Sequence, residues 1–67
     1  MTFDREKLRR LRIRQGYSQQ DLADKAKVAP RTVRDAESGK RVPRGYNRIK
    51  IAEALGCTPA DLISEAL

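Results

Sequence analysis

The sequence contains no histidine, no tryptophan and a single cysteine, Cys57, among its 67 residues. Zinc sites in proteins are built mainly from Cys and His ligands, and a Cys–His nucleophile needs one residue of each type. Neither can be assembled here, and no phosphate-binding glycine loop or acid–base pair stands out. We therefore predict that this chain is not an enzyme and that it uses no metal and no cofactor.

Long apolar runs are also absent. The N-terminus, MTFDREKLRRLR, is mostly charged, so we expect neither a signal peptide nor a membrane span. One cysteine cannot form an internal disulfide, which fits a reducing cytosol. A chain of 67 residues is close to the lower limit for a self-supporting core, so residues 1–67 should form one domain.

Acidic residues are fewer than basic ones, with nine Asp and Glu against 15 Lys and Arg, giving a net charge of +6. Residues 5–14 carry six basic side chains and one acid, residues 40–50 carry five and none, and residues 51–67 carry three acids and no base. Such a charge favours nucleic acid, or less often an anionic membrane surface, as the partner. The plainer alternative is a solvated helix face beside a charged loop.

Capping residues and glycines divide the chain into five short helices. Asp4, Ser18 and Thr58 are good N-caps, and Pro30 is well suited to the first helical position. The expected helices run from Asp4 to just before Gly16, over about 18–26, 30–38 and 46–55, and from Thr58 to the C-terminus. Apolar side chains recur every three to four residues within each, and no segment has the alternation of a β-strand.

Two charged residues fall on the apolar faces of these helices. Arg12 follows Leu8 by four residues, and Glu37 follows Val33 by four. An unpaired charge inside a core costs several kcal/mol, so we expect Arg12 and Glu37 to form an ion pair. The alternative is that each side chain reaches solvent at the edge of the core.

The run YSQQDLADKAKVAPRTVRDAESGK, with IAEALGCTPADLI after it, resembles the phage Cro and repressor (XRE) family of helix-turn-helix proteins. The shared pattern has Ser-Gln opening the second helix, Glu-x-Gly closing the third and Ala-x-x-Leu-Gly in the fourth, over about residues 5–65. The resemblance implies an all-α, lambda-repressor-like fold of five short helices. It also implies that the helix over 30–38 enters the major groove of DNA, and that Arg12 and Glu37 pair.

The same resemblance places nine residues at the DNA: Gln19, Pro30, Arg31, Thr32, Arg34, Asp35, Lys40, Arg41 and Arg44. Gln19 would touch the DNA backbone or a base edge, and the last three would meet phosphate or the minor groove. By its chemistry, Arg31 can donate two hydrogen bonds to guanine, or contact phosphate only, as can Arg34. Asp35 can accept from cytosine N4 or pair with Arg31 one turn earlier.

Two positions depart from the family pattern in the turn before the third helix. Lys27 stands where glycine is common, and a non-glycine residue in a left-handed conformation costs about 1 kcal/mol. Ala29 replaces the usual Ser or Thr cap, at a further cost of about 1 kcal/mol. We expect this turn either to carry that strain or to be built differently.

Together these features predict a sequence-specific DNA-binding transcriptional regulator, a repressor that occupies its operator. We expect weak homodimers on a near-palindromic operator, with Ile63 and Leu67 of the last helix at the interface, although both could instead cap the small core. No ligand pocket is evident from the sequence. A second class stays open, namely an antitoxin or another module whose main partner is a protein.

Overall fold

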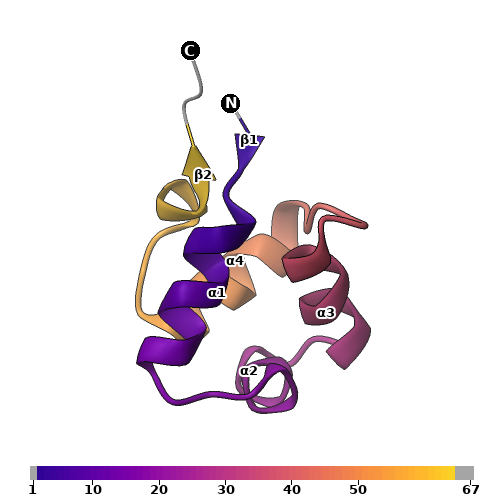
Figure 1. The fold of residues 1–67 in the computed structure, drawn as a ribbon, viewed down its shortest axis with the longest axis vertical. Coiled ribbons are helices and arrows are strands. Elements are labelled where there is room, and N and C mark those ends of the chain that lie inside the picture. Colours follow the sequence, from indigo (N-terminus) through magenta and orange to yellow (C-terminus); the bar gives the residue numbers. More distant parts are fainter. Residues whose placement is uncertain (1, 65–67) are drawn as a thin grey trace.

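The computed structural model describes residues 2–64 as a bundle of short helices closed by a small strand pair (Figure 1). The elements are β1 (Thr2–Phe3), α1 (Arg5–Arg14), α2 (Gln19–Ala26), α3 (Pro30–Ser38), α4 (Gly45–Leu55), the 3₁₀ turn η1 (Pro59–Leu62) and β2 (Ile63–Ser64). The predicted limits of the first four helices lie within one residue of those observed. Among the helices of residues 2–64, none combines the length and apolar character that a membrane span needs.

The predicted helix starts are visible as hydrogen bonds. The Asp4 side chain accepts from the backbone N–H of Lys7 at 3.0 Å and caps α1. At the start of α2, the Asp21 N–H donates to Ser18 Oγ at 2.9 Å, and the Ser18 N–H donates to the Asp21 carboxylate at 3.0 Å. This reciprocal capping box satisfies two amides that the helix itself cannot pair.

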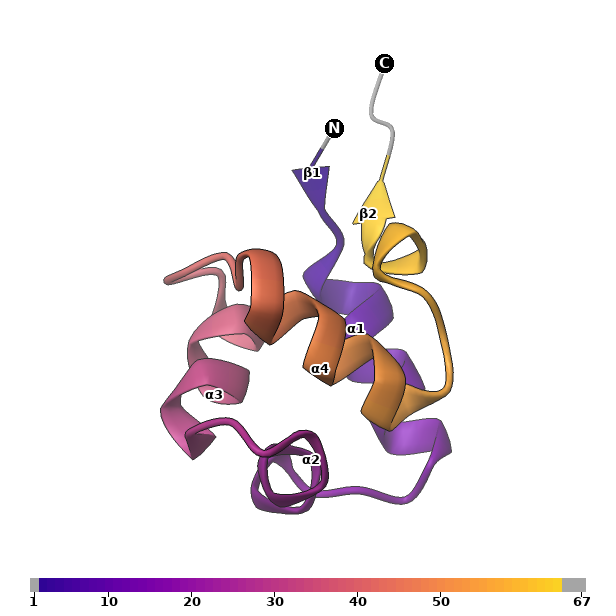
Figure 2. The same cartoon turned by 180° about the vertical axis from the view of Figure 1, so that it is seen from behind.

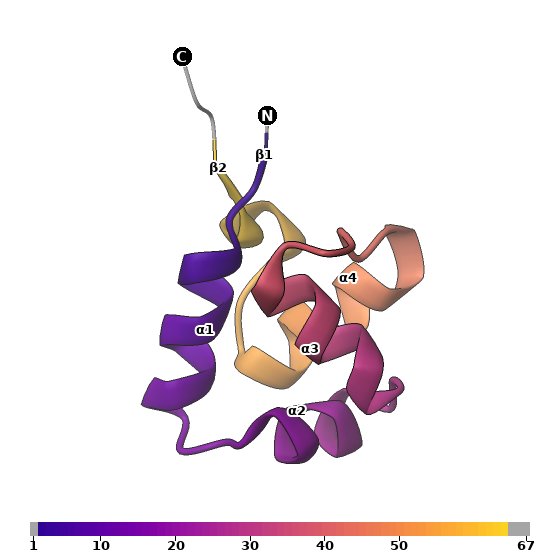
Figure 3. The ribbon, with the colours of Figure 1, turned by 45° about the vertical axis from the view of Figure 1, so that its right-hand side comes forward.

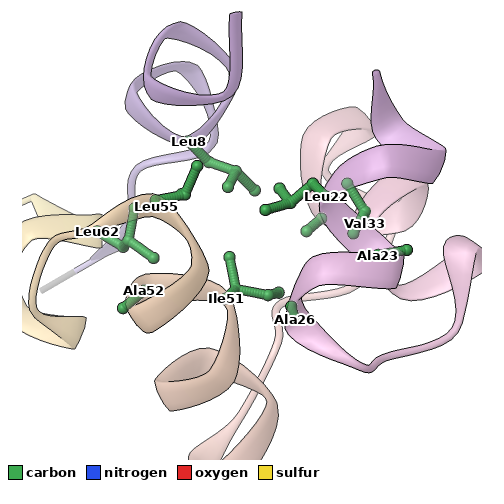
Figure 4. Packing of buried hydrophobic residues seen from close by; sticks show 10 residues of the cluster. Leu8, Leu22, Ala23, Ala26, Val33, Ile51, Ala52, Leu55 and Leu62 are labelled. Carbon is green, nitrogen blue, oxygen red and sulfur yellow. The ribbon is translucent and has the colours of Figure 1, made fainter. Parts of the chain in front are cut away.

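One apolar core lies between the helices (Figure 4). Its five largest fully buried side chains come from five different elements, in order α1, α2, α3, α4 and η1: Leu8, Leu22, Val33, Ile51 and Leu62. Buried alanines, among them Ala23 and Ala52, allow the short helices to approach closely. Seen from behind, α4 crosses the molecule between α3 and the 3₁₀ turn (Figure 2). Each helix therefore buries one side, and α3 keeps the other side free.

The C-terminal segment differs from the predicted fifth helix. After η1 the backbone becomes extended at Ile63, with φ −112° and ψ 130°. Thr2 pairs with Ser64 and Phe3 with Ile63 in an antiparallel ladder. The backbone N–H of Asp4 donates to the Leu62 carbonyl at 2.7 Å, which occupies the acceptor that a continuing helix would use four residues later. The β-branched Ile63 also suits an extended backbone.

Two expectations from the sequence are therefore wrong. The chain does contain strand, at both ends of the described residues, and Ile63 does not lie on a helix but is half-buried in β2. The proposed partner of Ile63 at the dimer interface, Leu67, lies outside the described residues. The helical placement that first suggested this interface does not apply at Ile63.

Candidate nucleic-acid interface

The α2 and α3 helices are joined by a three-residue turn, residues 27–29, in the arrangement of a helix-turn-helix. Lys27 adopts a left-handed conformation with φ 59° and ψ 44°, the one non-glycine residue among residues 2–64 with positive φ. Its neighbour Val28 donates from its backbone N–H to the Ala23 carbonyl at 3.0 Å. The turn is thus a left-handed helix end that glycine would adopt with less strain.

The third helix presents two unlike faces. Val33 and Ala36 are buried in the core, whereas Pro30, Arg31 and Arg34 are exposed. Figure 3 shows α3 along the front of the molecule, with α1 on one side and the loop to α4 above it. A helix this short is marginal by itself, so contacts with the rest of the protein must hold it in place.

The strongest of these contacts is an ion pair from α1. Arg12 Nε donates to Glu37 Oε2 at 2.5 Å, and Arg12 Nη2 donates to Oε1 at 3.1 Å. The two side chains are only 12% and 6% exposed. Arg12 also donates to the backbone carbonyl of Tyr17 at 2.7 Å, so the same guanidinium fixes the segment that leads into α2. A two-pronged, largely desolvated pair of this kind holds a fixed geometry.

Gln19 belongs to the same network. Its side-chain amide donates to Glu37 Oε1 at 3.3 Å, and the residue is half-buried. The sequence predicts that Gln19 touches the DNA backbone or a base edge; in this structure its side-chain amide donates to the carboxylate of the ion pair. Its amide oxygen and its second N–H form no hydrogen bond within residues 2–64, so both can still bond to another molecule.

A hollow of about 290 Å³ lies between α3, the loop over 39–44 and the start of α4. Its lining comprises Arg31, Thr32, Asp35, Arg41, Val42, Pro43, Arg44 and Asn47. Three arginines and one carboxylate make the hollow net positive, which suits an anionic partner. Five of the nine residues assigned to DNA thus lie together here, whereas Pro30, Arg34 and Lys40 are exposed outside it.

Asp35 departs from what its sequence position suggests. The residue is only 7% exposed, and the sole ion pair formed within residues 2–64 is that of Arg12 with Glu37, so Asp35 does not pair with Arg31. Its backbone carbonyl accepts from the Arg41 N–H at 3.2 Å and from the Ser38 hydroxyl at 3.2 Å. These bonds draw the loop over Asp35, which explains its burial.

Sequence reasoning missed two residues of α4. Asn47 lines the hollow, and Arg48 Nε donates to the Pro43 carbonyl at 3.1 Å, holding the basic loop against the helix. Their position in the first turn of the helix that follows the loop was the available signal. Among residues 2–64, no group of three His, Cys, Asp or Glu side chains could hold a metal ion.

Comparisons with known proteins agree with this geometry. A helix-turn-helix family model matches residues 8–62. The crystal structure of the restriction-modification controller protein C.AhdI from Aeromonas hydrophila is similar to this chain at a TM-score of 0.82 and 34% sequence identity, over 88% of this chain and 89% of that one. No curated protein matches the chain significantly.

Proposed function

The chain belongs to the helix-turn-helix family and is a DNA-binding transcriptional regulator, and from this premise we propose that it represses transcription by occupying an operator with α3 in the major groove. The observation that carries the proposal is the exposed basic face of α3 beside an arginine-lined hollow. The likeness to a restriction-modification controller protein favours restriction-modification genes as its target. Its place of action would be the cytoplasm of a bacterial or phage-infected cell.

We assign base reading to the exposed side of α3. Arg31 is exposed on the first turn and can donate two hydrogen bonds to guanine O6 and N7. Arg34, one turn further along, serves as a second base or phosphate contact. Thr32 and Pro30 complete this surface through apolar and hydroxyl contacts.

We assign contacts with the DNA backbone to the loop over 39–44 and to the start of α2. Arg41 and Arg44 line the hollow and Lys40 is exposed beside it, so all three can neutralise phosphates. Gln19 reaches DNA through its unused amide atoms while Glu37 holds the side chain in place. The burial of Asp35 favours a role in relieving repulsion among the surrounding arginines over direct contact with cytosine.

A single copy inserts one short helix into one stretch of groove. We propose that two copies bind a near-palindromic operator, with half-sites about 34 Å apart. Ile63 lies in β2 and not on a helix, but its side chain is only half-buried, so we keep Ile63 and Leu67 as the proposed contacts between the copies. An Ile63→Lys variant should then lower cooperative binding to two half-sites while its affinity for a single half-site stays unchanged.

The decisive experiment is a footprint on the DNA that flanks the protein's own gene, together with titrations of that fragment and of random duplex at several salt concentrations. We expect a protected site with two-fold symmetry, bound in preference to random DNA, and affinity that falls steeply with salt. Equal affinity for the flanking fragment and for random duplex would contradict the proposal that the protein recognises a specific operator. Absence of salt-dependent DNA binding, with capture of a protein partner instead, would favour the antitoxin alternative.

A further inference from the structure

Arg5, at the start of α1, reaches across to the end of α3. Its Nη1 donates to the Ser38 carbonyl, the last residue of α3, at 2.5 Å. Gly39 allows this approach, because a Cβ at that position would overlap the Arg5 guanidinium. Figure 3 shows the start of α1 beside the end of α3, although the two segments are 33 residues apart in sequence.

This contact changes the charge at the end of α3. The unpaired carbonyls of a helix C-terminus carry about half a negative charge, which repels phosphate. Arg5 covers one of these carbonyls with a full positive charge. A guanidinium has five N–H donors in a planar fork, so the bond to Ser38 leaves most of them available, and the side chain is exposed to solvent.

A second arginine converges on the same place. A hollow of about 300 Å³ separates β1 from the loop after α3, and it is lined by Thr2, Phe3, Arg5, Ala36, Gly39, Arg41 and Val42. Arg5 precedes the helix-turn-helix in the sequence and Arg41 follows it, and none of the lining residues is acidic. Two like charges facing one hollow without a carboxylate repel each other unless an anion lies between them.

We propose that Arg5 and Arg41 form a phosphate clamp that holds one phosphodiester of the DNA backbone at the C-terminal end of α3. The clamp rests on the DNA-binding function proposed above, and it adds α1, a helix outside the helix-turn-helix, to the interface. It also ties the position of α3 to the DNA strand, because one guanidinium bonds both the helix end and the phosphate.

The test compares Arg5→Gln with Arg10→Gln, a matched control on α1. Arg10 lies over a different hollow, whose other lining residues are Glu6, Arg9 and Ile13, none of them from α3 or its loop. Each variant is titrated by fluorescence anisotropy against a 20-bp mixed-sequence duplex between about 50 and 200 mM salt. We expect Arg5→Gln to reduce the slope of log affinity against log salt by about 1, and Arg10→Gln to leave it unchanged.

A third variant separates charge from helix capping. Arg5→Lys keeps the positive charge, so it should retain the wild-type salt slope even if the bond to Ser38 weakens. The clamp is wrong if Arg5→Gln keeps the wild-type slope while only its unfolding midpoint falls, if Arg5→Gln and Arg10→Gln lose slope equally, or if Arg5→Lys loses as much as Arg5→Gln. A wild-type protein without salt-dependent binding would instead overturn the proposed function.

Discussion

The two helices of the helix-turn-helix are held in place by different means. The α2 helix carries its own signals, a Ser18–Asp21 capping box at its start and a left-handed Lys27 at its end. The α3 helix has no side-chain cap, because Ala29 cannot supply one. Two residues of α1 hold it in place instead. Arg12 forms an ion pair with Glu37, and Arg5 donates a hydrogen bond to the Ser38 carbonyl.

This difference shows how a helix of nine residues can keep one face free. Local capping stabilises a helix but does not orient it. Long-range bonds from a neighbouring helix fix its position and leave its outer side chains unconstrained. We expect mutations in the α1–α3 bonds to displace or unfold α3, whereas mutations in the α2 cap should only lower stability.

The largest expected effect follows loss of the α1–α3 ion pair. Glu37→Ala leaves Arg12 largely buried without its carboxylate and removes the acceptor of Gln19. We expect the free energy of unfolding to fall by about 3–5 kcal/mol, a large share of the stability of a small domain. Urea denaturation followed by circular dichroism measures it.

Replacing both members of the pair is the matched control. An Arg12→Met, Glu37→Leu double variant leaves no unpaired charge, so it should recover much of the stability lost in Glu37→Ala. Strictly additive losses in the double-mutant cycle would reject the coupling between the two side chains.

The next effect concerns the exposed outer face of α3, the surface to which we assign base reading. Arg31→Ala should cost about 1–3 kcal/mol on the selected operator and relax preference at one base pair. Arg44→Ala should weaken operator and random DNA alike and flatten the salt dependence. If Arg31→Ala weakens both DNAs equally, Arg31 contacts phosphate only.

Local signals in the sequence predicted the helices well, because caps and glycines act over a few residues. Asp4, Ser18, Gly39 and Gly56 mark helix ends that the structure contains. The failure came at Ile63, where the competing partner of the Leu62 carbonyl is the Asp4 amide at the other end of the chain. Periodicity within a single segment carries no information about such a partner.

The candidate site likewise has features that the sequence predicts and features that depend on tertiary contacts. The exposed faces of Arg31 and Arg34 follow from helical spacing, since their neighbour Val33 is buried. The burial of Asp35 depends on how the loop folds over α3, and the contact of Arg5 depends on the start of α1 lying beside the end of α3. Both are tertiary contacts that sequence spacing alone does not determine.

A smaller effect on the free energy of unfolding is expected at the starts of α2 and α3. Ser18→Ala should lower the free energy of unfolding by about 1 kcal/mol, because the Asp21 amide loses its acceptor. Ala29→Ser should raise it by up to about 1 kcal/mol, because it gives α3 the cap that it lacks. Thermal or urea melts of the two variants measure both. If Ala29→Ser gave no gain, the start of α3 would already be satisfied by other groups.

The smallest effect is a pH dependence at the capped start of α2. The backbone N–H of Ser18, and then its hydroxyl, lower the pKa of the Asp21 carboxyl below its ordinary value of 3.8. A carboxyl whose pKa is lower in the folded than in the unfolded protein stabilises the fold above the unfolded pKa. That contribution is lost as the pH falls through the folded pKa. Asp21→Asn should therefore be less stable than the wild type at pH 7 and equally stable once the wild-type carboxyl is protonated.

Asp61, whose pKa the Thr58 backbone N–H lowers in the same way at η1, provides a matched variant with the same expected sign. Urea melts of both Asn variants from neutral pH to below pH 3.8 measure the difference, and a difference that stays constant with pH would show that the charge of the carboxylate contributes nothing to the cap.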